Sequence, residues 1–89
     1  MNRRVTIDVT PDFFSQYHSL PKDVKIKFKR QLLLFKTNPR HHSLKMHKIE
    51  GSNFWEFYVD DFYRCVVRQE GAAYRIYFLG MHKLIDRFK

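Results

Sequence analysis

The sequence predicts an α+β fold, in which an N-terminal strand and a helical hairpin pack on a twisted antiparallel β-sheet. Apolar residues recur at helical spacing between residues 13 and 36, and they alternate with polar residues from residue 44 onward. Because the helices come first and closely spaced strands follow, we expect an antiparallel meander with both helices on one face. The opposite face must then be polar or be used for binding.

The composition predicts a single domain that spans residues 1–89, because 89 residues are too few for two hydrophobic cores. Hydrophobic residues make up 44% of the chain, which is enough to fold without disulfides and argues against disorder. No apolar run exceeds four residues and the N-terminus lacks an apolar signal core, so a cytoplasmic location is expected. The single cysteine, Cys65, excludes an internal disulfide and is expected to be an inert core residue.

The first half of the chain is predicted to form one strand and two helices. Alternation over residues 5–9 predicts a short strand, and aromatic residues over 13–17 predict a helix that ends at Leu20–Pro21. The segment 22–36 is ambiguous, because its apolar residues fit both a period of two and steps of three and four. Its fifteen residues contain no glycine and follow a proline, so they are interpreted as a second helix that ends before Pro39.

The second half is predicted to form a four-stranded meander. The strands are expected at residues 44–49, 54–59, 63–69 and 73–79, with turns at Gly51–Ser52, Asp60–Asp61 and Glu70–Gly71.

The apolar pattern also predicts how these strands pair. A three-residue connection at 60–62 pairs Tyr58 with Arg64 and keeps the apolar residues on the core side. A two-residue loop at Glu70–Gly71 pairs Arg64 with Tyr77. On this register, the face away from the helices carries Glu56, Tyr58, Arg64, Arg68, Arg75 and Tyr77, while Tyr74, Ile76 and Phe78 point inward.

That face combines cationic and aromatic side chains, which can hold phosphates and stack on bases. It also has an ordinary structural explanation. Its arginines could pair with Glu56 and Glu70 across strands, and its tyrosines could be simple strand formers.

The charge of the chain is large and uneven. Seventeen lysines and arginines oppose nine acidic residues, and between Lys22 and Lys48 nine basic residues are opposed by Asp23 alone. A field of this sign suits a polyanion, either nucleic acid or an acidic protein segment. The alternative is a solvated basic helix face that keeps a small protein in solution.

The order of the motifs carries a family resemblance. Residues 54–67 contain a hydrophobic strand, an acidic turn and then Tyr63–Arg64 at the start of the next strand. A final strand ends in Leu-Gly-Met-His-Lys at residues 79–83. With the Leu-Lys-Met-His-Lys-Ile segment at 44–49 and the helical hairpin before it, essentially the whole chain resembles the RelE/ParE superfamily of bacterial toxins from type II toxin–antitoxin systems. The resemblance implies a RelE-like fold.

The resemblance implies one of two activities. RelE-, YoeB- and YafQ-like members are mRNA interferases that cut messenger RNA in the ribosomal A site, and an antitoxin neutralises them. ParE-like members share the fold but act on DNA gyrase and lack the nuclease residues. The leading hypothesis is a ribosome-dependent endoribonuclease toxin. The alternatives are a ParE-like gyrase inhibitor and a non-catalytic basic RNA-binding module.

The resemblance also assigns roles to individual residues. Arg64 matches the arginine that stabilises the scissile phosphate in nuclease members, and His82 matches the catalytic histidine of YoeB- and YafQ-like members. Glu56 and Tyr58 occupy two positions where RelE has lysines, so part of the RelE apparatus is missing. Phe88 stands where RelE has a tyrosine, so it can stack on a base but cannot exchange a proton.

Metal-free RNA cleavage needs a base for the 2′-OH proton, an acid for the leaving 5′ oxygen and cationic donors for the pentacoordinate phosphate. Histidine suits either proton role, and the arginine fork suits the phosphate. The hypothesis is therefore that Arg64 is the phosphate clamp and His82 the general acid. The base is left open between Glu56, His47 and His42, the last of which falls near a glutamate of the YoeB-like branch.

The remaining expectations concern partners. The residues expected to contact RNA phosphates or bases are Lys45, Lys48, Tyr58, Arg68, Arg75, Tyr77 and Phe88. Lys25, Lys29 and Arg30 on the basic helices are expected to contact 16S ribosomal RNA. The partners are then messenger RNA on the ribosome and a cognate antitoxin whose acidic or amphipathic segment covers the positive field. No cofactor is expected, and no metal, because no carboxylate or second cysteine completes a ligand set with the histidines at 41–47.

Overall fold

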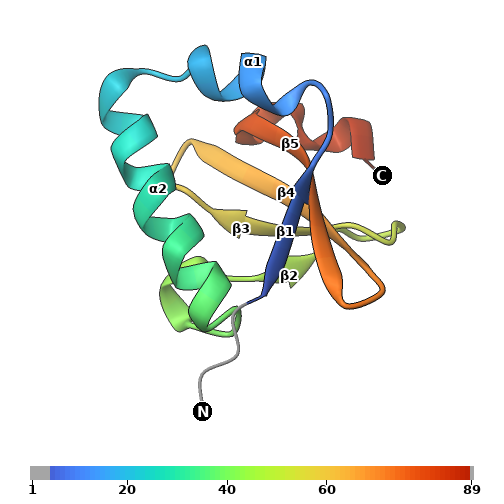
Figure 1. Ribbon diagram of the computed structural model, residues 1–89. Coiled ribbons are helices and arrows are strands. Elements are labelled where there is room, and N and C mark those ends of the chain that lie inside the picture. Colours follow the sequence, from blue (N-terminus) through green and yellow to red (C-terminus); the bar gives the residue numbers. More distant parts are fainter. Residues whose placement is uncertain (1–4, 89) are drawn as a thin grey trace.

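The computed structural model describes residues 5–88, apart from the side chains of residues 86 and 87 (Figure 1). Helices α1 and α2 lie along one side of a twisted sheet, and a short helix near the C-terminus lies beside β5 (Figure 1). The elements are β1 (Thr6–Val9), α1 (Phe13–His18), α2 (Lys22–Thr37), the 3-10 helix η1 (His42–Leu44), β2 (His47–Lys48), β3 (Trp55–Tyr58), β4 (Tyr63–Glu70), β5 (Ala73–Met81) and the 3-10 helix η2 (His82–Phe88).

The sheet has five strands in the order β1-β5-β4-β3-β2. Strands β2 to β5 form the predicted antiparallel meander, whereas β1 lies parallel to β5 at the edge. The sheet is therefore mixed, a feature that the alternation over residues 5–9 could not reveal. The α+β prediction itself is confirmed.

The ambiguous segment after Pro21 is a helix, as predicted. Its buried residues Val24, Phe28 and Phe35 are spaced by four and seven positions, which places them on one stripe facing the sheet. The helix ends at Thr37, because Pro39 disfavours helical geometry at Asn38.

The main core lies between the two helices and the sheet. Its fully enclosed centre includes Phe35 and Phe57, whose rings stack with their centroids 5.0 Å apart. Cys65 is buried in this core, so its predicted placement on the helix side is confirmed. These contacts show which face of the sheet the two helices cover. The opposite face is not covered by α1 or α2.

The predicted strand at residues 44–49 is largely wrong. The chain instead forms η1, then a left-handed residue at Lys45 with φ 47°, and only a two-residue β2. The Nδ1 atom of His41 accepts the backbone N–H of Ser43 at 3.2 Å, and the Gln31 amide donates to the Ser43 carbonyl at 3.2 Å. The backbone N–H groups of Leu44 and Lys45, which the predicted strand would have paired, donate instead to the carbonyls of His41 and His42.

The register of β3 and β4 is as predicted, with Tyr58 opposite Arg64. The predicted register of β4 and β5 is wrong. The loop is Gly71–Ala72, in which Gly71 has φ +63°, so Glu70 pairs with Ala73.

A β-bulge opposite the step from Val66 to Val67 then shifts the pairing again. Arg64 therefore pairs with Gly80 instead of Tyr77. Phe78, predicted to point toward the helices, lies on the other face because of the same bulge.

That other face carries a second, smaller core, so it is not open throughout. Helix η2 covers part of it, and Ile49, Val66, Phe78 and Ile85 are buried there with Phe54 and Phe88 packed against them. Gly80 gives the Phe78 ring its space, because a Cβ at that position would lie 2.6 Å from the ring. Within residues 5–88, no helix is long and apolar enough to cross a membrane.

Candidate functional site

Glu56 and Arg64 form the centre of the site, on adjacent strands and on the face away from the helices. Their relative exposures are only 3% and 4%, and Nε of Arg64 lies 3.7 Å from Oε1 of Glu56. At that distance the contact is an ion pair without a hydrogen bond. Nη1 of Arg64 donates to the carbonyls of Asp60 at 2.7 Å and Tyr63 at 3.1 Å, so the guanidinium is held in one orientation.

His47 completes this centre. Because His47 pairs with Glu56 in the sheet, its side chain falls on the same face, and Nε2 lies 3.0 Å from the same Oε1 atom that faces Arg64. Its Nδ1 lies 2.8 Å from the Lys45 carbonyl, which can only accept a hydrogen bond. The His47 ring can donate to both the Glu56 carboxylate oxygen and the Lys45 carbonyl oxygen only in its protonated form. The His47 side chain is 51% exposed, so this is the solvent-facing member of the cluster.

Tyr58 links the cluster to two cations. The Arg64 guanidinium lies 3.5 Å from the centre of its ring, and the Lys45 ammonium lies 4.7 Å from it. The Tyr58 carbonyl accepts a hydrogen bond at 2.8 Å from the Gln31 amide, which also binds Ser43. Gln31 therefore ties η1 and the end of β3 to α2. This role of Gln31 was not predicted, because its only signal in the sequence is a lone polar residue on an apolar helix stripe.

Asp60 shapes the turn that presents Arg64. Its carboxylate accepts the backbone N–H groups of Phe62 at 2.8 Å and Tyr63 at 2.9 Å, as an Asx turn does. Its Oδ2 lies 3.7 Å from the Lys27 ammonium on α2. The turn at Asp60–Asp61 is as predicted, whereas the role of the Asp60 carboxylate in ordering it was not predicted, although an aspartate at the first position of a turn is the signal for this motif.

His82 lies just beyond the end of β5. Gly80, two positions earlier, pairs with Arg64, and the His82 backbone N–H donates to the Phe62 carbonyl at 2.7 Å. The side chain is exposed and makes no hydrogen bond or ion pair within the part of the chain that the structure describes. Its imidazole is therefore available at the strand end next to the Arg64 turn.

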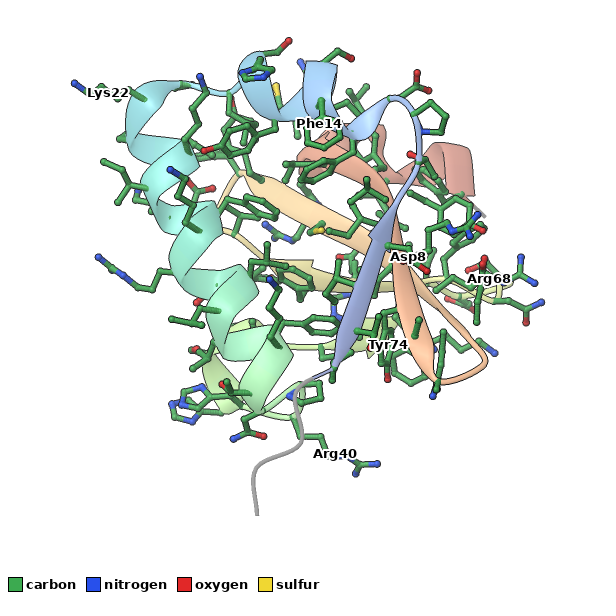
Figure 2. All side chains as sticks on the ribbon, viewed as in Figure 1. Asp8, Phe14, Lys22, Arg40, Arg68 and Tyr74 are labelled. Atoms are coloured by element: carbon green, nitrogen blue, oxygen red, sulfur yellow. The ribbon has the colours of Figure 1, made fainter. Side chains whose placement is uncertain are left out.

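A second polar group lies on the same face near the β4–β5 turn. The Tyr77 hydroxyl donates to the Glu70 carboxylate, and Nε of Arg75 lies 3.4 Å from Oε1 of Glu70. That hydrogen bond, helped by burial and by the charge of Glu70, raises the pKa of Tyr77. Arg68 projects from this region on the side away from α2 (Figure 2). The predicted arginine and tyrosine surface is thus present here, but Glu70 neutralises part of it.

Three residues that were predicted to belong to the site lie away from the Glu56–Arg64 centre. His42 stacks on His41 with ring centroids 4.5 Å apart, at the C-terminal end of α2. Lys48 pairs with Trp55, so it faces the opposite side of β2 from His47. Phe88 packs against Phe54 and Phe78 in the second core.

The predicted ribosomal RNA contacts lie on α2. Lys29 and Arg30 are exposed there, while the Lys25 ammonium lies 5.6 Å from the centre of the Tyr17 ring. Among the residues described, no three histidine, cysteine, aspartate or glutamate side chains come together in a way that could hold a metal ion.

No protein-family profile matches this sequence, and no curated protein sequence matches it either. Solved structures do share its fold. A chain of the DinJ–YafQ toxin–antitoxin complex from E. coli matches with a TM-score of 0.73 and 17% identity, over 90% of this chain and 94% of that chain. A chain of the archaeal RelE–RelB complex from Pyrococcus horikoshii matches with a TM-score of 0.71 and 16% identity, over 91% and 98%.

The YoeB/ParE toxin from Agrobacterium tumefaciens matches with a TM-score of 0.69 and 15% identity, over 88% of this chain and 99% of that chain. The chain therefore has the fold of the RelE, YoeB, YafQ and ParE toxins. The fold that the sequence motifs implied is confirmed.

Proposed function

We propose that this protein is the toxin of a toxin–antitoxin pair and acts in the cytoplasm as a ribosome-dependent endoribonuclease that needs no metal ion. The likeness in fold supports the toxin role. The observation that carries the nuclease role is the Glu56 carboxylate held between His47 and Arg64, beside a strand end that presents His82. This arrangement would supply a base and a phosphate-binding cation on one sheet face and an acid at the adjacent strand end.

The proposed reaction is an in-line transfer within the RNA. The base takes the proton of a 2′-OH group, the 2′ oxygen forms a bond to the adjacent phosphorus, and the bond from phosphorus to the 5′ oxygen breaks. An acid gives a proton to that leaving 5′ oxygen. The products are a 2′,3′-cyclic phosphate and a free 5′-OH end.

We assign the base to Glu56. Its closest contacts to His47 and Arg64 are both made through Oε1, so Oε2 is assigned to accept the 2′-OH proton. His47 then acts as a positioning residue, because it touches Glu56 from the solvent side. His42, the third candidate, is stacked on His41 and makes no contact with Glu56.

Arg64 is assigned to the phosphate and His82 to the leaving group. Nη1 of Arg64 is occupied by two carbonyls and Nε faces Glu56, so Nη2 is the nitrogen proposed to donate to a phosphate oxygen. An arginine whose position is fixed before the substrate binds stabilises developing charge without reorganisation. His82 has an exposed imidazole, which suits proton transfer near neutral pH.

The experiment is a toeprint of messenger RNA on programmed ribosomes, with the wild-type protein, the His82→Ala variant and His18→Ala as the matched histidine control. Wild type and His18→Ala should cleave within the A-site codon, and His82→Ala should be slower by about 100-fold or more. Equal cleavage by all three proteins would remove His82 from the mechanism.

A ParE-like gyrase inhibitor is the second candidate. Glu56 favours it, because a carboxylate beside Arg64 neutralises a charge that RNA would otherwise meet. In this case the message stays intact on the ribosome, and the protein inhibits supercoiling in a gyrase assay.

We also propose that the basic surface of this protein binds an antitoxin through an acidic amphipathic segment of that antitoxin. Ile26 and Leu33 on α2 are each 55% exposed and lie beside the exposed Lys29 and Arg30, a pattern that fits such a segment. The formal net charge of +8 favours the same partner. A saturating antitoxin should raise Tm, and an unchanged Tm would contradict direct binding.

A further inference from the structure

A cleft of about 540 Å³ lies at the end of the sheet, where β3 and β5 begin and β4 ends. It lies on the helix side, near the C-terminal end of α2, and so on the other face from Glu56 and Arg64. Figure 2 shows two of its lining residues, Arg40 below the end of α2 and Tyr74 on the sheet above it. None of the roles assigned so far uses this cleft as a site.

Two aromatic side chains form part of its wall. Trp55 is the only tryptophan of the chain, and it is 39% exposed. Within the described residues its indole makes no hydrogen bond and contacts no other ring. Tyr74 is fixed by an edge contact with Phe35 at 5.0 Å. A partly exposed indole in a concave site is a surface on which a flat base can stack.

The charged and titratable side chains that line the cleft are all basic. Arg40, His41, His42 and Lys45 line the cleft, and no carboxylate among the described residues does. The two imidazoles are stacked on each other, so they present one basic surface. Such a lining attracts an anion that also carries a flat ring.

Lys45 joins this cleft to the candidate site on the other face. It lines the cleft, and its ammonium also lies 4.7 Å from the Tyr58 ring, on which the Arg64 guanidinium stacks. Lys45 is also the one non-glycine residue among those described whose φ is positive. A strained backbone of this kind persists only where its surroundings impose it, and such positions are common at functional sites.

We propose that the cleft binds one unpaired nucleotide of single-stranded RNA, with its base stacked on Trp55 and its phosphate held by Arg40 and Lys45. An acidic peptide would also satisfy the cations, but it would make no use of the exposed indole of Trp55 or of the Gln69 amide in the lining. The choice of RNA rests on the proposed nuclease function. The cleft then holds a nucleotide near the one that Arg64 contacts, and Lys45 marks the path of the strand between them.

The test uses the fluorescence of Trp55, which reports on this cleft alone because the chain has no other tryptophan. The probe is a 2′-O-methyl RNA trinucleotide, which cannot be cleaved, and the control is an abasic trinucleotide with the same phosphates. The trinucleotide should quench Trp55 to saturation, and the abasic control should bind at least tenfold more weakly. This assay needs neither ribosomes nor cleavage, so its failure is distinguishable from failure of the nuclease proposal.

Variants locate the binding, with anisotropy of a labelled trinucleotide as the readout. Arg40→Ala should lower the affinity about fivefold, whereas Lys22→Ala, which removes a charge of the same sign from the exposed start of α2, should change it less than twofold. Trp55→Ala should lower the affinity at least fivefold. Trp55→Phe keeps an aromatic ring, so it should lower the affinity less, and it provides the test if Trp55→Ala unfolds the protein.

Three results would overturn the proposal. Equal binding of the abasic control would make the cleft a general polyanion surface. No quenching by either oligonucleotide would remove it from RNA recognition. Tighter binding of an acidic peptide than of the trinucleotide would assign the cleft to a protein partner.

Discussion

Glu56 on β3 and Arg64 on β4 form an ion pair that is almost completely shielded from solvent, with Nε 3.7 Å from Oε1. The two residues are diagonal neighbours, because Glu56 lies opposite Val66 and Arg64 lies opposite Tyr58. A buried ion pair adds little net stability, since the loss of hydration offsets the attraction. We therefore interpret this pair as a device that fixes the arginine in place for an anionic substrate.

The pair should show strong coupling in a double-mutant cycle. Glu56→Gln leaves the Arg64 charge buried without its counter-charge, so the free energy of unfolding should fall by about 2 kcal/mol. Adding Arg64→Met removes that charge, so the double variant should lose about 1–3 kcal/mol less than the sum of the single losses. Urea unfolding measures all four proteins, and additive losses would contradict the coupling.

His47 should affect the rate of cleavage more than the stability. His47→Ala removes the imidazole that contacts Glu56 from the solvent side, so the single-turnover rate at saturating protein should fall about tenfold or more. The protein concentration needed for half-saturation should not change, because His47 acts through Glu56. The exposed His18 on α1 provides the control, since His18→Ala should keep the wild-type rate. A change confined to the half-saturation concentration would instead make His47 an RNA-binding residue.

Cys65 should be chemically inert in the folded protein. Burial in the main core raises the pKa of its thiol well above the usual range, so little thiolate forms and reagents cannot reach it. With a disulfide reagent at pH 8, the native protein should react about 100-fold more slowly than the chain in guanidinium. Equal rates would show that the core around β4 opens readily.

Tyr77 should contribute a specific loss of stability at alkaline pH. Its hydrogen bond to Glu70 raises its pKa in the folded state, because the neutral phenol is the donor. A raised pKa means that the contribution is complete below about pH 10, the ordinary tyrosine value, and is lost as the pH rises through the folded-state value.

Tyr77→Phe should therefore lower Tm at neutral pH and show a shallower decline above about pH 10 than the wild type. Tyr63→Phe is the matched control, because the Tyr63 hydroxyl makes no hydrogen bond within the described residues. Identical alkaline profiles for wild type and Tyr77→Phe would show that the Glu70 bond does not form in solution.

The β3–β4 half of the site could be predicted from the sequence. The turn at residues 60–62 has a length that permits only one register with the apolar residues inside, and that register brings Glu56 and Arg64 to one face. The contact of His47 with Glu56 could not be predicted, because it depends on the short strand that follows the left-handed Lys45.

The β4–β5 half could not be predicted, because the bulge leaves no trace in the alternation of Tyr74, Ile76 and Phe78. The second core was missed for a related reason. Phe78 turns to the outer face only because of that bulge, and there it meets Phe88 of η2. Phe88 therefore packs in the second core and does not form the surface that was predicted to stack on a base.

The measurement that tests the central claim most directly is the chemistry of the RNA ends after incubation of programmed ribosomes with the wild-type protein. In-line attack by a 2′-OH group, with Glu56 as base and His82 as acid, predicts a cut in the A-site codon that leaves a 2′,3′-cyclic phosphate and a 5′-OH. Intact message, or cleaved message with a 3′-OH and a 5′-phosphate, would contradict this account.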